Sequence, residues 1–448
     1  MMKINKAFII EKTVFLMGMF STMSIVTIPL GSRDISVFRL FFFPILFFMI
    51  LRVFKQRKLI VRRSIRRLEL WLLLAFFSCL IGGITLNSKA PDFSSAAISN
   101  IPKTLLFLLF ATVWGSQDDE YVMKLNTLLI QGILLGFYLN LLWAIVDASV
   151  FYISGKSINN SVFSGYIARH SVRYGKISLV YSGLIRASGF NIDPANIGFI
   201  APVVTGIGLF KRNYWLVLFA FGGLLASASM TGFVCCFFVI IVYLSRVKSL
   251  KRNSGIKVNY LILLILILII LVAFGIKYGT FIIDIISQAT NSVFKRLSES
   301  YLNDSGLSDT IRWAYFIYAP LAFFNLNILG IFGLGFGTAS YGYVTDSYIL
   351  SKIGSSYAFP FDMENTYLAY LMDTGIVGLC IFISIIVLLF KWYKKRINYS
   401  QEVGDYNLTL FCCTLGMVFS MLFYHYILFA PQLLILIAGL SHIDLVKK

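Results

Sequence analysis

The apolar runs of this chain are the feature that most constrains its fold. Residues 40–49, 261–273 and 379–390 are almost entirely hydrophobic, so a helix formed there is apolar on every side. The chain is 58% apolar and 13% charged, and that charged share is about half of what a soluble protein carries. Because a helix that crosses a bilayer needs about 20 largely apolar residues, the sequence predicts an all-α, polytopic membrane protein without a separate soluble catalytic domain.

Apolar segments bounded by polar or glycine-rich breaks predict about twelve spans in one integral membrane domain, residues 1–448. The predicted spans are 14–30, 36–54, 70–86, 98–115, 125–153, 194–210, 214–227, 230–245, 259–276, 364–390, 406–424 and 426–442. The segment 214–245 is divided at Ser227–Gly232, because a single helix of about 48 Å would be longer than a bilayer is thick.

Orientation explains the net charge of +19 without a nucleic-acid partner. Basic clusters at 52–67, 246–257 and 391–396 flank predicted spans. Loops rich in Lys and Arg stay on the cytoplasmic side of a membrane. We therefore expect both termini to be cytoplasmic and two large loops, about 154–193 and 277–363, to lie on the outer side.

The first outer loop is basic, which is unusual for a loop on that side. It carries one acidic residue, Asp193, against Lys156, Arg169, His170, Arg173, Lys176 and Arg186. This excess indicates an anion at the outer face, and the planar guanidinium fork suits a phosphate. Binding to anionic lipid head groups explains Arg169, Arg173 and Lys176 equally well. Arg186 differs because it lies shortly before a span whose first turn contains Pro194, where free helix amides also attract anions.

The second outer loop and the span ends offer further candidates. Arg312 lies near the start of a predicted amphipathic helix, 309–324, and such an arginine alone is typical of a membrane interface. Glu364 stands at the outer end of a span, where it either complements the helix dipole or acts as a general base. Arg39 lies just inside the second span, which is unfavourable unless it reaches the surface or an anion, and Asp147 is a possible partner.

The sequence predicts neither a metal site nor a cofactor. The cysteines lie in hydrophobic stretches, and the three histidines are far apart in the chain, so no zinc-type spacing occurs. The glycine-rich segment 330–337 lacks the lysine and the preceding strand of a phosphate-binding loop.

Three motifs carry a resemblance to a known family. They are Arg186-Ala-Ser-Gly189 with Pro194-Ala-Asn196, then Gly333-Leu-Gly335-Phe-Gly337, and then Glu364-Asn365-Thr-Tyr367-Leu368 with Gly375-Ile-Val-Gly378. Together with twelve spans and two large outer loops, they resemble the O-antigen polymerase and O-antigen ligase superfamily. The resemblance implies a GT-C-like fold and a metal-independent glycosyltransferase that uses undecaprenyl-diphosphate-linked glycans, in the bacterial cytoplasmic (inner) membrane.

The resemblance also implies roles for individual residues. One arginine of each large outer loop holds the lipid diphosphate in this family, which implicates Arg186 and Arg312 as catalytic, with Glu364 accepting a proton or orienting the acceptor sugar. Further expected substrate-binding residues are Arg39, Arg169, His170, Arg173, Lys176, Asn196, Asn365 and Tyr367. Expected partners are membrane lipids, a chain-length regulator and a flippase.

Ligases of the family have a histidine where this chain has Glu364, which favours a polymerase of O-antigen, capsule or exopolysaccharide repeat units. Transfer of a finished glycan by a ligase-type enzyme is the first alternative. A polysaccharide flippase or transporter is the second, although such proteins tend to show two comparable halves, and this chain does not.

Overall fold

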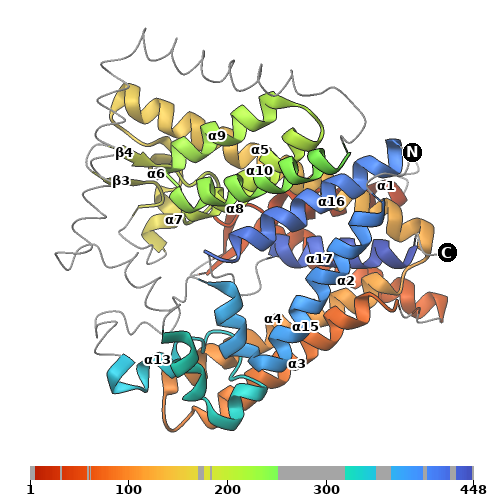
Figure 1. Ribbon diagram of the computed structural model, residues 1–448, viewed down its shortest axis with the longest axis vertical. Coiled ribbons are helices and arrows are strands. Elements are labelled where there is room, and N and C mark those ends of the chain that lie inside the picture. Colours follow the sequence, from red (N-terminus) through yellow and green to blue (C-terminus); the bar gives the residue numbers. More distant parts are fainter. Residues whose placement is uncertain are drawn as a thin grey trace.

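The computed structural model describes residues 6–30, 33–57, 60, 62–169, 176–181, 184–250, 318–349, 365–396, 401–423 and 430–445. Most of these residues are helical, and the described strands form two short antiparallel hairpins. The chain is therefore a mainly helical, polytopic membrane protein, as the sequence predicts (Figure 1).

The first half of the chain supplies most of the long helices. Its elements are α1 (Lys6–Phe20), β1 (Thr27–Leu30), β2 (Arg33–Ser36), α2 (Val37–Gln56), α3 (Ile65–Thr85), α4 (Pro91–Gly115), α5 (Asp119–Ser154), α6 (Ile158–Val162), α7 (Ser164–Arg169), β3 (Leu179–Tyr181) and β4 (Leu184–Arg186). The strands pair antiparallel, with Thr27 opposite Ser36 in the first hairpin and Leu179 opposite Arg186 in the second.

The second half continues with shorter apolar helices. Its elements are α8 (Ala195–Phe210), α9 (Tyr214–Ser227), α10 (Met230–Leu250), the 3-10 helix η3 (Asn327–Ile331), α13 (Tyr341–Val344), α15 (Thr366–Arg396), α16 (Gln401–Ser420) and α17 (Ala430–Leu445). Residues 318–324, within the predicted amphipathic helix 309–324, are also helical. The predicted span 259–276 lies outside the described residues.

Within the described residues, five helices are long and apolar enough to cross a membrane. These are α2, α3, α4, α5 and residues 366–393 of α15. Five shorter apolar helices accompany them, at 195–210, 214–227, 231–244, 406–420 and 430–445. Each of these helices coincides with a predicted span, whereas the total of twelve stays a prediction.

The first predicted span, 14–30, is wrong at its C-terminal end. Helix α1 stops at Phe20, and residues 27–30 form the strand β1 instead. The hydroxyls of Ser21 and Thr22 donate to the carbonyls of Gly18 and Met19, at 2.6 and 2.8 Å. These hydroxyls bond to carbonyls at the helix end, in place of the backbone amides of a continuing helix. Hydropathy alone does not reveal such side-chain bonds.

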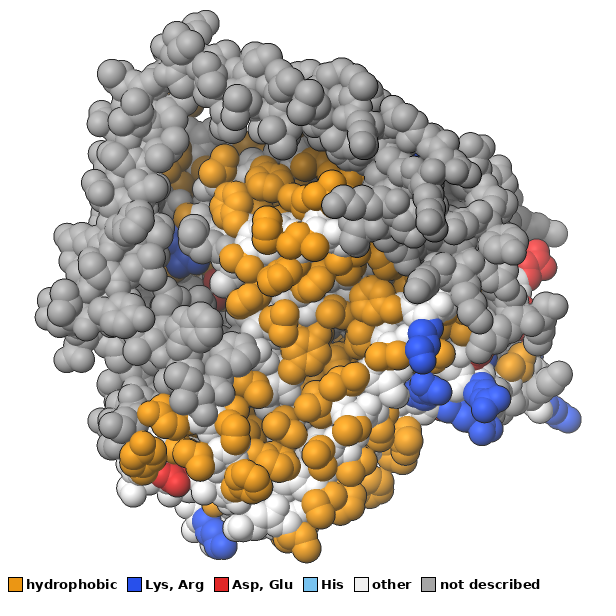
Figure 2. All heavy atoms as spheres, in the orientation of Figure 1, with side chains coloured by type: hydrophobic (Ala, Val, Ile, Leu, Met, Phe, Trp, Pro, Cys, Tyr) orange, Lys and Arg blue, Asp and Glu red, His pale blue; other side chains and the backbone are white. Residues whose placement is uncertain are grey.

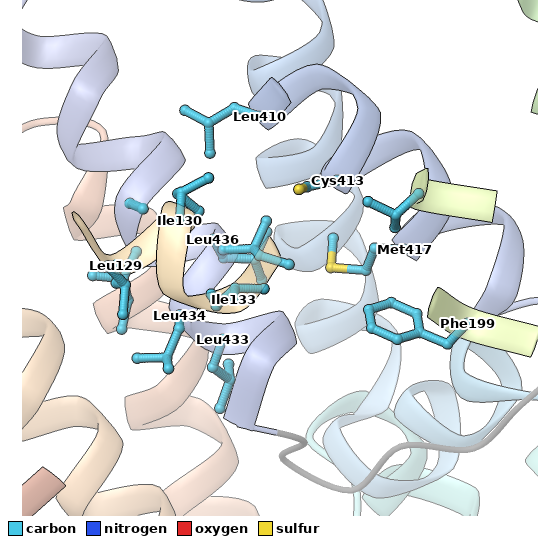
Figure 3. Packing of buried hydrophobic residues seen from close by; sticks show 14 of the residues in the cluster. Leu129, Ile130, Ile133, Phe199, Leu410, Cys413, Met417, Leu433, Leu434 and Leu436 are labelled. Carbon is cyan, nitrogen blue, oxygen red and sulfur yellow. The ribbon is translucent and has the colours of Figure 1, made fainter. Parts of the chain in front are cut away.

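Helices α8 and α17 lie in the interior of the bundle. Every residue from Ile197 to Leu209, and from Pro431 to Ile443, is buried. Figure 3 shows where α5, α8, α16 and α17 meet, with side chains such as Ile133, Phe199, Met417 and Leu436 in one cluster. A helix that is mostly apolar on all sides belongs in such an interior position, which agrees with the largely hydrophobic sequences of these two short helices.

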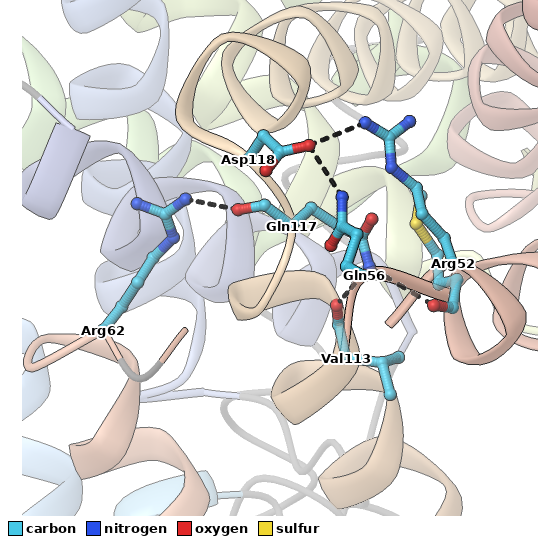
Figure 4. A network of polar contacts seen from close by, with 7 residues as sticks. Arg52, Gln56, Arg62, Val113, Gln117 and Asp118 are labelled. Atoms are coloured by element: carbon cyan, nitrogen blue, oxygen red, sulfur yellow. Dashed lines mark hydrogen bonds and ion pairs between the residues drawn. The ribbon is translucent and has the colours of Figure 1, made fainter. Parts of the chain in front are cut away.

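A polar network joins the turn between α4 and α5 to α2 and to the start of α3 (Figure 4). Asp118 accepts from Arg52 at 2.9 Å and from Gln56 at 2.7 Å. The buried Arg62 donates to the carbonyl of Gln117 at 2.7 Å and pairs with Asp119 at 2.9 Å. The two adjacent aspartates therefore hold helix ends together, and their carboxylates are occupied by basic side chains.

Helix α15 bends at Gly375, where φ is +70°. A side chain at Gly375 would collide with the backbone of Ile331, and one at Gly333, where φ is +76°, would collide with the backbone of Asp373. The backbone of the glycine-rich segment therefore packs directly on the bend. This close contact requires glycine on both sides.

Both labelled termini lie at one end of the bundle, and the β3–β4 hairpin and α13 lie at the other (Figure 1). On the face shown in Figure 2, hydrophobic side chains cover the middle and the largest group of basic side chains lies towards the end that carries the termini. The orientation of the chain in the membrane stays a prediction.

We predict that Lys156, after α5, is outside and that Arg63, before α3, is inside. Both side chains are exposed. In a variant whose six native cysteines are replaced, a membrane-impermeant thiol reagent applied to intact cells should label Lys156→Cys and not Arg63→Cys. Labelling of Arg63→Cys without labelling of Lys156→Cys would contradict the predicted orientation and indicate the opposite one.

Candidate functional site

Arg186 lies beside the break between α9 and α10. It is the last residue of β4 and is half-buried, and its Nε lies 3.5 Å from the carbonyl oxygen of Ser227, the last residue of α9. The next residue, Ala187, donates its amide to the carbonyl of Ala226 at 2.9 Å. The first large loop is thereby bonded to the end of α9, which brings Arg186 to a place where two apolar helices are interrupted.

The break itself has a defined geometry. Ala228 adopts the left-handed conformation, with φ 46°, and ends α9. The Oγ of the buried Ser229 accepts the amide of Gly232 at 3.3 Å, as an N-cap residue does at the start of a helix. Gly232 packs closely on the backbone of Gly198 near the start of α8, since a side chain at Gly232 would collide with it. Arg186, the start of α10 and the start of α8 therefore come together at the predicted outer end.

A buried carboxylate on α5 organises the loop that carries Arg186. Asp147 is fully buried, and its Oδ1 accepts from the Ser157 hydroxyl at 2.9 Å and from the Asn159 amide at 3.0 Å. Its Oδ2 accepts from the Ser178 hydroxyl at 2.7 Å. These donors replace the water that the carboxylate loses on burial. The expected pairing of Asp147 with Arg39 is therefore wrong, since both carboxylate oxygens bond to the first large loop.

The side chains of Asn159 and Asn140 extend this network to the residues that follow Arg186. Asn159 donates through Nδ2 to the Ser188 hydroxyl at 2.9 Å and to the Gly189 carbonyl at 3.0 Å. The Oδ1 of Asn140 accepts from the Phe190 amide at 2.9 Å and from Asn191 at 2.8 Å. The segment directly after Arg186 is therefore fixed, with Ser188 and Gly189 bonded to α6 and Phe190 and Asn191 bonded to α5.

The other basic residues of the first large loop are not equivalent. Arg169 forms a two-pronged contact with Asp34 of β2, at 3.0 and 3.1 Å, and that carboxylate is almost fully buried. A carboxylate thus occupies the guanidinium fork that was expected to bind phosphate. Lys176 is exposed and has no ion pair among the residues that the structure describes. His170 and Arg173 lie outside the described residues.

The expected residues at the start of α15 have structural partners. Asn365 caps the helix, because its Oδ1 accepts the Leu368 amide at 2.9 Å, and its Nδ2 donates to the Leu422 carbonyl at 2.7 Å. The Tyr367 hydroxyl donates to the Val418 carbonyl at 3.0 Å. Both residues therefore fix α15 against the end of α16. The neighbouring Glu364, and Arg312, lie outside the described residues.

Two further expected residues, Asn196 and Arg39, are within reach of solvent. Asn196 is half-buried in the first turn of α8, and its backbone amide bonds to the Asp193 carbonyl at 3.1 Å. Arg39 is exposed in the first turn of α2. The structure thus brings Arg186 and Asn196 to the same end of the bundle, each near the start of α8.

A second buried aspartate, Asp373 of α15, anchors the glycine-rich segment. Its Oδ1 accepts from the Thr338 amide at 3.2 Å, and its backbone carbonyl accepts from the Gly335 amide at 2.6 Å. Further along the same loop, Asp346 accepts from the Ile349 amide at 3.0 Å and from Asn325 at 3.3 Å. These bonds lower the pKa of Asp346 and keep it negatively charged.

Sequence reasoning missed Asn140, Asn159 and Asp373 as organising residues. All three are fully buried polar side chains, and two of them interrupt strongly apolar runs. Polar residues inside a predicted span commonly have a specific role. That signal was present for Asn140 and Asp373, whereas Asn159 lies in the loop and gives no such signal.

Comparison with known families supports one assignment. Residues 215–383 match the O-antigen ligase family (Wzy_C), and this match includes the α9–α10 break, the glycine-rich segment and the first half of α15. This match supports a relationship to the O-antigen polymerase and ligase superfamily. No curated protein matches the chain. The match also supports a polymerase- or ligase-type activity on lipid-linked glycans in a multi-pass membrane protein.

We predict that Asp147→Asn destabilises the protein by roughly 2 to 4 kcal/mol, because the buried carboxylate loses charge-assisted hydrogen bonds and an amide NH₂ then faces donor groups. Thermal unfolding of the purified protein in detergent measures this as a lower melting temperature. Asp193→Asn is the matched control, since the carboxylate of Asp193 is exposed and accepts the Ala195 amide at 2.8 Å. Equal melting temperatures for both variants would contradict the organising role of Asp147.

Proposed function

We propose that the protein polymerises undecaprenyl-diphosphate-linked oligosaccharide repeat units at the outer face of the bacterial cytoplasmic membrane. The family match supports glycan transfer in general. Glu364, in the position where ligases of the superfamily have a histidine, favours polymerisation over transfer to a lipid A core. The observation that carries the proposal is the bond from Arg186 to Ser227, because it joins the first large loop to the segment that matches the family.

The proposed reaction joins two lipid-linked glycans. A hydroxyl oxygen on the terminal sugar of one glycan attacks the anomeric carbon at the reducing end of the growing glycan. A new C–O bond forms, the bond between the anomeric carbon and the diphosphate oxygen breaks, and lipid diphosphate leaves with both bonding electrons. Glu364 takes the proton of the attacking hydroxyl or orients the acceptor sugar.

Arg186 is proposed to stabilise the leaving diphosphate. Negative charge develops on that group as the bond breaks, so a fixed guanidinium binds the transition state more strongly than the ground state. The hydrogen bonds around Asp147 and Asn159 hold the loop before the substrate arrives, so little reorganisation is required during the reaction. Arg312 of the second large loop is proposed to bind the same diphosphate.

The geometry of the guanidinium predicts a severe loss of activity in Arg186→Lys. An ammonium group cannot present two aligned donors to a phosphate, so Arg186→Lys should fail nearly as badly as Arg186→Ala. Each variant should lose about a hundred- to a thousandfold in turnover, measured with purified protein and lipid-linked repeats. Near-normal turnover of Arg186→Lys would contradict a two-donor contact with phosphate and show that only the positive charge of Arg186 matters.

The polymerase assignment is tested by the product of the reconstituted enzyme. Purified protein in lipid vesicles, supplied with lipid-linked single repeats alone, should give a ladder of longer glycans that remain on the lipid carrier. A ligase should leave single repeats unchanged until a lipid A core acceptor is added. A transporter should give no new glycosidic bond, and either of these results would contradict polymerisation.

A further inference from the structure

Two basic side chains lie near each other on neighbouring apolar helices. Arg39 is in the first turn of α2 and Lys103 is in the middle of α4. Both helices are candidate membrane spans, and they pack against each other. Both side chains are exposed. Phe42, about one turn after Arg39, packs on Phe107 of α4, with ring centroids 5.7 Å apart. Phe107 lies about one turn after Lys103, so the two cations are at a similar level on adjacent helices and their charges repel each other. Such a pair is unfavourable next to a bilayer unless an anion neutralises it.

No carboxylate of the described residues neutralises this pair. The ion pairs found there join Arg52 to Asp118, Arg62 to Asp119, Lys124 to Glu11 and Arg169 to Asp34. Lys103 donates instead to the neutral Oδ1 of Asn100, at 2.8 Å. A neutral amide orients the ammonium group without cancelling its charge, so the pair keeps two net positive charges.

The surroundings of the pair indicate which anion is available. Apolar side chains of α2 are exposed next to Arg39 and one and two turns further along the helix, and apolar side chains of α4 are exposed on either side of Lys103. They are Leu40, Phe43 and Phe47 on α2, and Ile98, Leu105 and Leu109 on α4. These side chains face lipid in a membrane protein. Arg39 lies in the first turn of α2 and Lys103 lies five residues inside the predicted span 98–115, so the pair lies just inside the predicted outer boundary. Their long side chains can extend from there to the level of the lipid head groups.

Asn100 connects this pair to the glycine-rich segment. Its Nδ2 donates to the carbonyl of Phe336 at 3.0 Å, and the side chain is buried. Lys103 is therefore held by a residue that is itself fixed, which lowers the entropy lost when a ligand binds. A point-like ammonium and a planar guanidinium together suit a phosphate with several oxygens.

We propose that Arg39 and Lys103 bind the phosphate head group of a membrane lipid between α2 and α4. For an anionic phospholipid this inference is independent of the proposed polymerase function, whereas for a polyprenyl diphosphate it rests on that function. Two lipids carry the required chemistry, an anionic phospholipid and a polyprenyl diphosphate, and binding experiments distinguish them.

Lipid binding to the purified protein tests the proposal. Native mass spectrometry of protein in detergent, titrated with phosphatidylglycerol, undecaprenyl diphosphate or neutral phosphatidylcholine, gives the affinity for each lipid. Arg39→Gln/Lys103→Gln should weaken binding of at least one phosphate-bearing anionic lipid about tenfold or more, because two cations are lost. The anionic lipid whose affinity falls identifies the natural ligand.

The matched control is Lys89→Gln/Lys156→Gln, which removes the same charge from two exposed lysines of the predicted outer side. It should change anionic-lipid binding by less than about twofold. If the control and the Arg39/Lys103 variant lose binding equally, or if neither does, the proposed site is wrong.

The melting temperature of Arg39→Gln provides a second test that does not depend on measured affinities. In detergent without anionic lipid, this variant should melt at the same temperature as the wild type or higher, because repulsion from Lys103 is relieved. In nanodiscs that contain the anionic lipid, it should melt at a lower temperature than the wild type. A lower melting temperature under both conditions would indicate an ordinary structural role and contradict the proposal.

Discussion

The buried carboxylate of Asp147 is the interaction on which the arrangement around Arg186 depends. A charged carboxylate inside an apolar bundle is strongly unfavourable unless hydrogen-bond donors surround it. The loop after α5 provides those donors through Ser157, Asn159 and Ser178. Meeting this requirement holds these three residues against α5. Asn159 in turn bonds to Gly189, just after Arg186, and Arg186 lies beside the end of α9.

The glycine-rich segment, in the described part of the second large loop, is held in a related way. Asp373 is buried in α15 and accepts the Thr338 amide, while the bend at Gly375 admits the backbone of the preceding loop. In both loops an aspartate on a long apolar helix therefore anchors a segment of irregular backbone. Irregular backbone is tolerated near a membrane when protein groups satisfy its hydrogen bonds. Both aspartates accept hydrogen bonds from backbone amides of these segments.

The apolar helices were predictable because burying polar groups in lipid is so unfavourable that hydropathy alone locates the spans. The break at Ser227–Gly232 was predictable for a related reason, since an uninterrupted helix would exceed the bilayer. The strand at 27–30 was not, because an apolar segment reads the same whether it is helical or extended.

The sequence also could not predict which residues that are far apart in the chain form contacts with each other. Arg169 binds Asp34, 135 residues earlier in the chain, and nothing in the local pattern of either residue indicates the other. Asn365 shows the intermediate case. An asparagine before an apolar run is a recognisable N-cap signal, but its donation to Leu422 follows only from the packing of α15 on α16.

The central claim is that Asp147 acts on glycan transfer through the placement of Arg186. A double-mutant cycle on turnover, using Asp147→Asn, Arg186→Ala and the double variant, tests it most directly. We predict that Asp147→Asn lowers turnover about tenfold when Arg186 is present and by less than about twofold when Arg186 is already replaced, since the misplaced group is then absent. An equal loss in both backgrounds would show that the two residues act independently and would contradict the account.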